Sequence, residues 1–456
     1  MSWCSDNLRD CQAWRDSGLV LDTVSNEAAR YWDAVLRQYV SWIDADELGG
    51  IEESLKRMKA ADSNFVMGQV LGLGLELIGT GRCTRLDPVL SHLDKACDVW
   101  EEILSEQPRD LLALKLAHDT YFYLGDSSNI RDGPGRVLPA WDRSVLLYGH
   151  LKGMLAFGLE ECNDFDAALK AGSEALELNR QDAWATHALA HVYEMRGQTQ
   201  DGLHFLSTTR NDWDPCAMLA CHNHWHWALY HLERGELDAA LAVYDREVGR
   251  RMVSGAMLDI VDASSLLLRL QMEDVPVGEK RWQDLAEIVT PHGKDHILLF
   301  NDAHVAAALG GAEARQDAEE QALSLAEYVR SSVGSNADVS RRFGEPLLQG
   351  LRAYMEGRFA DAAEALADLD GCALQTIGGS NAQAAMPTLP STFIGSIQMA
   401  LQRDVFDLLR INAHLRSDRP KDKQAAGPMI CAREARKAES PMNRRLRARF
   451  QAAHGQ

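Results

Sequence analysis

Histidine and glutamate side chains recur at helical spacing near the middle of the chain. In the segment DAWATHALAHVYEMRG, His191 follows His187 by four residues, and Glu194 follows His191 by three. These separations place all three side chains on one face of a helix. His222 and His226 show the same four-residue separation in AMLACHNHWHWALY. Because imidazoles titrate near neutral pH and bind transition metals when neutral, the pattern allows metal binding, acid–base catalysis or recognition of a ligand.

A metal site is the most specific of these interpretations. Its candidate ligands are His187, His191, Glu194 and His222, with His226 one helical turn after His222. A ligand set without cysteine thiolates is typical of an open, exchangeable metal site. The sequence has no HEXXH motif, and the order of the ligands matches no metalloprotease. A polar groove for a ligand is therefore the favoured interpretation, a structural hydrogen-bond network is another, and no particular cofactor is specified.

The helices that must hold these side chains are predicted by an internal repeat. The tetratricopeptide repeat is a pair of antiparallel helices with a period of about 34 residues. Ala168 and Ala175 fit the small-residue positions of a second helix, and Gly197 fits the turn of the next unit. ERGELDAALAVYDRE and MEGRFADAAEALADL repeat that turn at Gly235 and Gly357. The chain is therefore predicted to be an all-α, tetratricopeptide-like helical-repeat solenoid, in which antiparallel helix pairs form a right-handed superhelix.

The same frame assigns several first-helix positions to the concave groove of this solenoid. Four neighbouring helices contribute imidazoles, carboxylates and aromatic rings to the groove, which is the face on which solenoids bind partners. We therefore expect a peptide or small-molecule ligand there, and the alternative is an enzyme that uses the same histidines, with or without a transition metal. For His304, packing between helices is the competing interpretation, and His118 is expected to be buried beside Asp119 or a backbone group. The predicted groove residues are Lys115, Asp119, His150, Glu160, His187, His191, Glu194, His222, Trp225, His226 and His304.

Local composition divides the chain into four segments. Residues 1–22 are predicted to be an irregular lead-in, residues 23–370 the helical repeats, and residues 403–456 C-terminal helices with a basic end cap. Residues 371–402 are rich in Gly, Ser, Thr and Pro, which predicts a loop or an insertion. The basic end cap is expected to be a solvated helix rather than a nucleic-acid surface, because the rest of the chain is acidic.

Charge and cysteine content limit the partners and the compartment. The formal charge of −20 argues against broad nucleic-acid binding, which needs a basic face. The nine cysteines are scattered and form no CxxC pair, as expected in a reducing compartment. The first residues have no apolar signal core, and no window is apolar for long enough to span a bilayer. These features predict a soluble, cytoplasmic protein.

Several longer segments of the sequence are more specific for one protein family than the repeat pattern is. They include SNEAARYWDAVLRQYVSW, DLLALKLAHDTYFYLG, HNHWHWALY and LLFNDAH. Together they resemble the tetratricopeptide repeat protein 38 family over nearly the whole chain. The resemblance implies an all-α intracellular repeat protein and no particular reaction. The sequence departs from the family pattern in two places: it is shorter by about one helix pair between residues 86 and 96, and residues 384–402 are inserted before Arg403.

Overall fold

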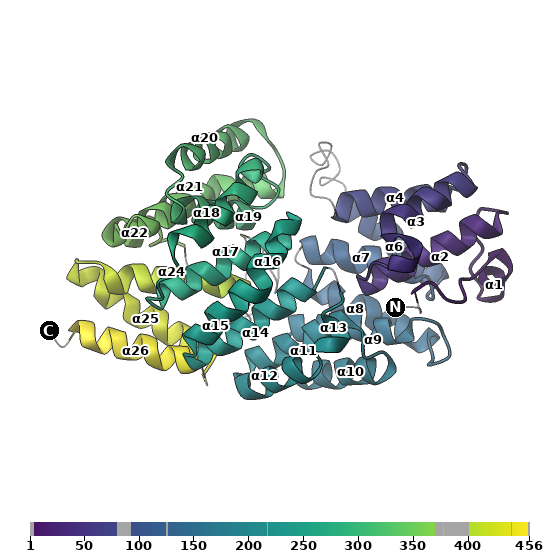
Figure 1. Cartoon of the computed structure of the whole chain (residues 1–456), viewed down its shortest axis with the longest axis horizontal. Coiled ribbons are helices and arrows are strands. Elements are labelled where there is room, and N and C mark those ends of the chain that lie inside the picture. Colours follow the sequence, from purple (N-terminus) through teal and green to yellow (C-terminus); the bar gives the residue numbers. More distant parts are fainter. Residues whose placement is uncertain are drawn as a thin grey trace, which may run out of the picture. The chain divides into compact units, whose positions relative to one another are not determined.

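The computed structural model describes residues 4–79, 93–124, 126–216, 218–369, 377, 401–438 and 440–454. Every regular element in these ranges is a helix (Figure 1), which confirms the predicted all-α, tetratricopeptide-like helical-repeat fold. None of the described helices is both long and apolar enough to cross a membrane. The helices form two compact units. Unit 1 comprises the described parts of residues 1–121, 128–189 and 208–220, and unit 2 comprises those of residues 122–127, 190–207 and 221–456.

Unit 1 is built from N-terminal helices and from the first part of α11 (Ala183–Met195). In its hydrophobic core the rings of Trp14 and Trp32 meet edge to face, with centroids 4.7 Å apart. The side chain of Ser25 accepts a hydrogen bond from the amide of Ala28 and so fixes the start of the following helix. The remaining helices are α1 (Cys11–Asp16), α2 (Asn26–Ser41), α3 (Gly50–Ala61), α4 (Val66–Gly79), α6 (Leu93–Glu106), most of α7 (Leu111–Leu124), α8 (Ser127–Val137), α9 (Tyr148–Glu161), α10 (Phe165–Leu178) and α13 (Arg210–Trp213).

Small residues allow the helices of a repeat to approach closely. Ala156 of α9 and both Ala168 and Ala175 of α10 are fully buried. A Cβ atom added at Gly172 would lie only 2.8 Å from Cδ2 of Leu189 on α11, so a larger residue there would collide with the next helix. The predicted second-helix positions of Ala168 and Ala175 are therefore confirmed.

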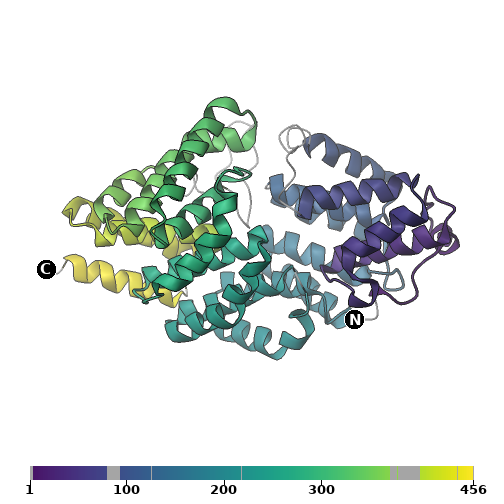
Figure 2. The ribbon, with the colours of Figure 1, turned by 45° about the horizontal axis from the view of Figure 1, so that its top comes forward.

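Unit 2 is built from the middle and C-terminal helices. Its helices, besides the second part of α11, are α12 (Thr199–Thr208), α14 (Ala220–Arg234), α15 (Leu237–Val243), α16 (Gly249–Arg251), α17 (Met257–Met272), α18 (Glu279–Val289), α19 (Leu299–Gly311), α20 (Arg315–Ser331), α21 (Ser335–Met355), α22 (Phe359–Ala365), α24 (Leu401–Arg416), α25 (Pro420–Arg436) and α26 (Pro441–His454). A second hydrophobic cluster, which includes Leu267, Leu285 and Val405, forms its core. The helix α24 packs against α17, α22 and α25, so the C-terminal helices lie beside middle helices of the same unit (Figures 1 and 2).

Three turns predicted from the repeat have the expected backbone conformation. Gly197, Gly235 and Gly357 have φ angles of 69°, 76° and 74°, and they join α11 to α12, α14 to α15 and α21 to α22. Glycine adopts this left-handed region readily, whereas other residues adopt it rarely. The repeat pattern therefore predicts these turns correctly.

The structure adds detail to the two ends of the chain. The lead-in of residues 1–22 contains the short helix α1, whose first amides donate to the side chain of Asp10. In the basic end cap, Arg445 and Arg449 lie 2.8 Å and 3.4 Å from carboxylate oxygens of Glu273, so both are paired within unit 2. Most of residues 371–402, and most of residues 86–96, lie outside the described residues.

Candidate functional site

Four side chains of unit 2 form the candidate site, called the histidine site below: His191 on α11, and His222, Trp225 and His226 on α14. The ring centroid of His226 lies 4.6 Å from that of His191 and 4.7 Å from that of His222. One nitrogen from each of the three histidines lies within 4.8 Å of the other two. All four side chains are at most 2% exposed. Helical spacing and the packing of these helices therefore bring together histidines that the sequence singled out.

Two carboxyl groups hold the imidazoles of α14. Nδ1 of His222 lies 2.9 Å from each carboxylate oxygen of Asp262 on α17, and Nδ1 of His226 lies 3.2 Å from Oε2 of Glu194. When the carboxyl group is ionised it accepts, so Nδ1 is then the donor and Nε2 the basic nitrogen. Burial raises the pKa of Asp262, with His222 acting against it. Burial also raises the pKa of Glu194 to about 7, with Lys437 acting against it.

Trp225 packs against His222 in the histidine site. Its ring stacks on His222, with centroids 5.1 Å apart and an interplanar angle of 12°. The guanidinium carbon of Arg269 lies 6.0 Å from the Trp225 ring centroid. The indole Nε1–H of this fully buried side chain has no hydrogen-bond acceptor among the described residues. Buried indole N–H groups normally have a hydrogen-bond partner, so this donor is an exception to the general pattern.

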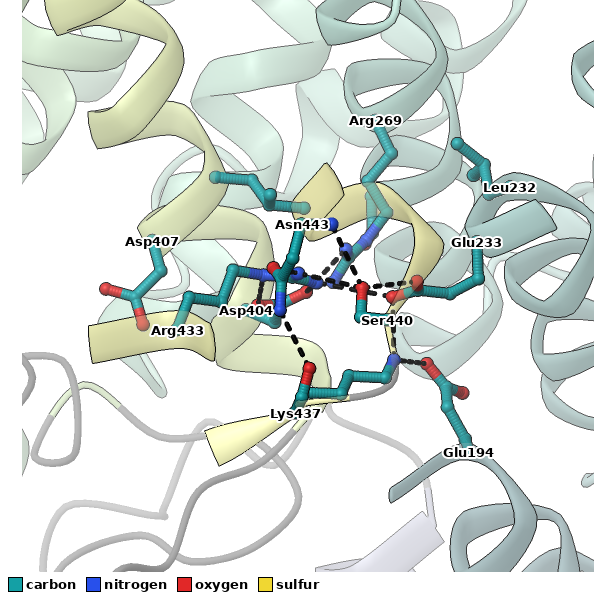
Figure 3. Close-up of polar contacts among 12 residues, drawn as sticks. Glu194, Leu232, Glu233, Arg269, Asp404, Asp407, Arg433, Lys437, Ser440 and Asn443 are labelled. Atoms are coloured by element: carbon teal, nitrogen blue, oxygen red, sulfur yellow. Dashed lines mark hydrogen bonds and ion pairs between the residues drawn. The ribbon is translucent and has the colours of Figure 1, made fainter. Parts of the chain in front are cut away.

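A network of buried charges lies next to Glu194 in the same unit (Figure 3). At its centre, Nε and Nη2 of Arg433 donate to the two carboxylate oxygens of Asp404 at 2.8 Å and 2.9 Å. Nζ of Lys437 donates to Glu233 at 2.7 Å and lies 3.5 Å from Oε1 of Glu194 (Figure 3). The network therefore connects the segment after α25 with the helix that carries His191 and Glu194.

Opposite charges keep the acidic groups of this network ionised. Although burial acts in the opposite direction, Lys437 and Arg433 lower the pKa of Glu233 to about 2. Arg433 likewise lowers the pKa of Asp404 against the effect of burial. Ser440 donates a further hydrogen bond of 2.6 Å to Glu233. Removing any one charge would leave its partner buried and uncompensated, so the network stabilises the unit only when it is complete.

The predicted groove residues of unit 1 form buried pairs of their own. Nζ of Lys115 lies 2.5 Å and 2.6 Å from the two carboxylate oxygens of Asp119, and the hydroxyl of Tyr39 donates to the same carboxylate at 2.6 Å. Nδ1 of His150 lies 3.2 Å from Oδ2 of Asp182. These contacts pair Lys115 with Asp119 and His150 with Asp182 inside unit 1.

His187 and Glu160 complete the predicted groove residues of unit 1. Both are buried, with 3% and 0% of their surfaces exposed. His187 lies one turn before His191 on α11, and its ring centroid lies 5.4 Å from Trp184 and 5.5 Å from Phe157. His187 is therefore packed among aromatic rings.

The side chains assigned to the concave groove are buried in the structure. Every one of the predicted groove residues is at most 6% exposed. The physical reason is that charged and polar groups at these positions pair with each other or pack against rings, which removes the cost of burying them alone. They do not form an open surface on which an extended peptide would lie.

His304 and His118 are packing histidines. Nδ1 of His304 lies 2.8 Å from the carbonyl oxygen of Phe300, and its ring centroid lies 5.4 Å from that of Phe406. Burial lowers the pKa of His304 to about 4, so the imidazole is neutral at neutral pH. Nε2 of His118 lies 3.3 Å from the carbonyl oxygen of Met154, as expected for a buried histidine beside a backbone group. For His304 the structure favours the packing interpretation over a place in a groove.

The candidate metal ligands take different places in the structure. His191 and His222 have donor atoms close together, with those of His226 beside them. Glu194 instead contacts Nδ1 of His226, and His187 belongs to unit 1. Within unit 2 the assembled set is therefore three imidazoles, with His226 in the role that the sequence analysis gave to Glu194.

Several charged residues near the histidine site were missed by the sequence analysis. Asp262 and Arg269 lie in MLDIVDASSLLLRLQME, and isolated charges in such an apolar helix are a usable signal, because charges are buried only when paired. Arg433 and Lys437 gave no comparable signal, since the surrounding C-terminal segment is polar throughout.

Comparison with known proteins gives a limited result. No family model matches the sequence. Among solved structures, the chain is similar to one described as a human IFIT1 dimer with m7Gppp-AAAA, at 13% sequence identity and a TM-score of 0.39. The similarity covers 95% of this chain and 89% of that chain. Such a distant similarity gives no guide to the ligand of this protein.

Proposed function

We propose that this chain is a helical-repeat protein that binds a small molecule at the histidine site. The indole N–H of Trp225, a buried donor without an acceptor among the described residues, carries the proposal. The ring that carries this N–H lies beside the imidazoles of His222 and His226, with centroids 5.1 Å and 4.9 Å away, and Asp262 and Glu194 contact these imidazoles. A compact ligand with acceptor oxygens matches these groups, whereas the burial of the site argues against an extended peptide.

The acidic character of the chain argues against nucleic acid as the ligand. The formal charge is −20, and Arg445 and Arg449 of the basic end cap are paired with Glu273. The cysteines of the described residues include the buried free thiols Cys216 and Cys221, which supports a reducing, cytoplasmic location. The segments that resemble the tetratricopeptide repeat protein 38 family also support an intracellular repeat protein.

Mass spectrometry of small molecules extracted from the purified protein tests this function. The variant Trp225→Phe keeps the ring and removes only the N–H donor, so we expect it to retain roughly tenfold less ligand than the wild type, as for one lost hydrogen bond. Trp227→Phe is the matched control on α14, because the Trp227 N–H already donates to His231 at 3.2 Å. Equal ligand retention by Trp225→Phe, Trp227→Phe and the wild type would contradict the proposal.

The pair formed by His222 and Asp262 favours an acid–base enzyme as the second candidate. A carboxylate on Nδ1, here at 2.9 Å, orients an imidazole and makes its other nitrogen a better base. An enzyme consumes the compound that it binds, whereas a binding protein only retains it. Incubation of the wild type and of Asp262→Asn with the extracted compound separates the two, because only an enzyme converts the compound and loses that conversion on Asp262→Asn.

A further inference from the structure

We propose that the histidine site holds a transition-metal ion, with His191, His222 and His226 as its protein ligands. The ion would occupy the site of the proposed small molecule and offer it an open coordination position. The inference therefore rests on the proposed function for the ligand, although metal binding itself is measured separately. It also defines the ligand chemistry: a small molecule with an oxygen donor that coordinates the ion.

The spacing of the three imidazoles suits a shared ion. One nitrogen from each lies within 4.8 Å of the other two. A tetrahedral ion with metal–nitrogen bonds of about 2.0–2.1 Å holds its ligand atoms roughly 3.3 Å apart. Binding of an ion would therefore draw the three nitrogens closer together than they lie in the structure. Three protein ligands leave the fourth position open, as in catalytic rather than structural zinc sites.

Two carboxyl groups that contact the imidazoles are a second, independent observation in favour of a metal site. Asp262 contacts Nδ1 of His222 at 2.9 Å, and Glu194 contacts Nδ1 of His226 at 3.2 Å. In metal sites the nitrogen of a histidine that does not bind the metal usually donates to a carboxylate, which fixes the ring and strengthens the ligand. Two of the three proposed ligands have this arrangement.

The surrounding groups fit a divalent ion that prefers nitrogen. Imidazole ligands suit zinc, copper, iron and nickel, whereas calcium and magnesium prefer oxygen. Cys221, adjacent to His222, points elsewhere, because its sulfur contacts the carbonyl oxygen of Val248 at 4.0 Å. The carboxyl groups of Asp262 and Glu194 lie next to the site, in contact with Nδ1 of His222 and of His226.

Cobalt substitution tests the metal site directly on the wild-type protein. Protein treated with chelator and then titrated with Co²⁺ should bind about one equivalent and develop the visible absorption of a four- or five-coordinate ion. X-ray absorption at the cobalt edge should show a first shell with about three imidazole nitrogens. Binding of less than about a tenth of an equivalent, or a shell without imidazole, would overturn the inference.

Variants locate the ion and separate the two proposals. His222→Ala and His226→Ala should abolish the cobalt spectrum, whereas Asp262→Asn should weaken cobalt binding by about 10–100-fold. His231→Ala is the control on the same helix, since His231 pairs with Glu236 at 2.7 Å and should bind cobalt like the wild type. Wild-type cobalt binding in both His222→Ala and His226→Ala would also overturn the site. Trp225→Phe should bind cobalt like the wild type, because Trp225 is not one of the proposed ligands, while it retains roughly tenfold less of the small molecule. Failure of ligand binding and failure of metal binding are therefore distinct results.

Discussion

Two glutamates of unit 2 show that neighbours, rather than residue type, set the charge of a buried group. Burial raises the pKa of Glu194 to about 7, whereas Lys437 and Arg433 lower that of Glu233 to about 2 against the effect of burial. Sequence spacing predicted that His222 and His226 share a helix face. It did not predict these charges, because Lys437 is separated from Glu233 by 204 residues and from Glu194 by 243.

At the residue scale, we expect His304→Leu to make the protein less sensitive to mild acid. Burial lowers the pKa of His304 from its ordinary 6.5 to about 4, so below pH 6.5 the unfolded chain binds a proton that the folded chain does not. The wild type therefore loses stability as the pH falls through this window, by up to roughly 3 kcal/mol for this group, and a leucine does not. Melting temperatures of both proteins at several pH values between about 7 and 4 test this. Equal slopes with pH would contradict it.

At the scale of helices, local patterns predicted the turns but not the long-range pairs. Gly197, Gly235 and Gly357 were predicted because a turn needs only nearby residues, and all three have the left-handed backbone. The burial of the predicted groove residues was not predicted, because the repeat frame gives the direction of a side chain along its helix and not what the rest of the chain places over it. Arg433 shows this, since it is buried against Asp404 and Glu233 from two other helices.

We expect Glu233→Gln to loosen the attachment of α25 and α26 to α14. The variant leaves Lys437 and Arg433 buried with one carboxylate fewer, at a cost on the order of 3–5 kcal/mol. Hydrogen exchange should become faster in α25 and α26, while helices of unit 1 keep their wild-type rates. Glu236→Gln is the control, since that glutamate is 39% exposed at the start of α15 and its replacement should leave exchange unchanged. Unchanged exchange in α25 and α26 of Glu233→Gln would refute the role of this network.

The same network predicts how the helices respond to acid. A lowered pKa means that the folded state holds fewer protons than the unfolded state, so the stabilisation by Glu233 is complete above pH 4.5 and is lost as the pH falls toward about 2. Acid titration followed by circular dichroism should therefore show a smaller loss of stability in this pH range for Glu233→Gln than for the wild type. An equal loss in both proteins would assign the acid sensitivity to other groups.

At the scale of the whole molecule, the described chain has two hydrophobic cores, one in each unit. Trp14 and Trp32 belong to the core of unit 1, and Leu267 and Leu285 belong to that of unit 2. The proposed ligands His191, His222 and His226, and the carboxyl partners Asp262 and Glu194, are residues of unit 2. Damage confined to the interior of unit 1 should therefore leave the chemistry of the site intact.

Lys115→Met tests this separation of the units. It leaves Asp119 buried without its cation, which should destabilise unit 1 by about 3–5 kcal/mol and speed hydrogen exchange in α2 and α7. The double variant Lys115→Met with Asp119→Asn removes both charges and should recover much of the loss. Cobalt binding at the histidine site should match the wild type in both variants. Equally fast exchange throughout unit 2 would show instead that the units unfold together.

The hydrogen bond between Lys437 and Glu233 also has a consequence for how the protein is made. The two residues are 204 positions apart. At a synthesis rate of about 5–20 residues per second, Lys437 is therefore synthesised roughly 10–40 s after Glu233. During that interval α14 has been synthesised, but the lysine and arginine that neutralise its carboxylate have not. The nascent chain therefore passes through a stage in which this helix cannot bury Glu233 at low cost. At that stage a chaperone bound to the growing chain would contribute most to the stability of the helix.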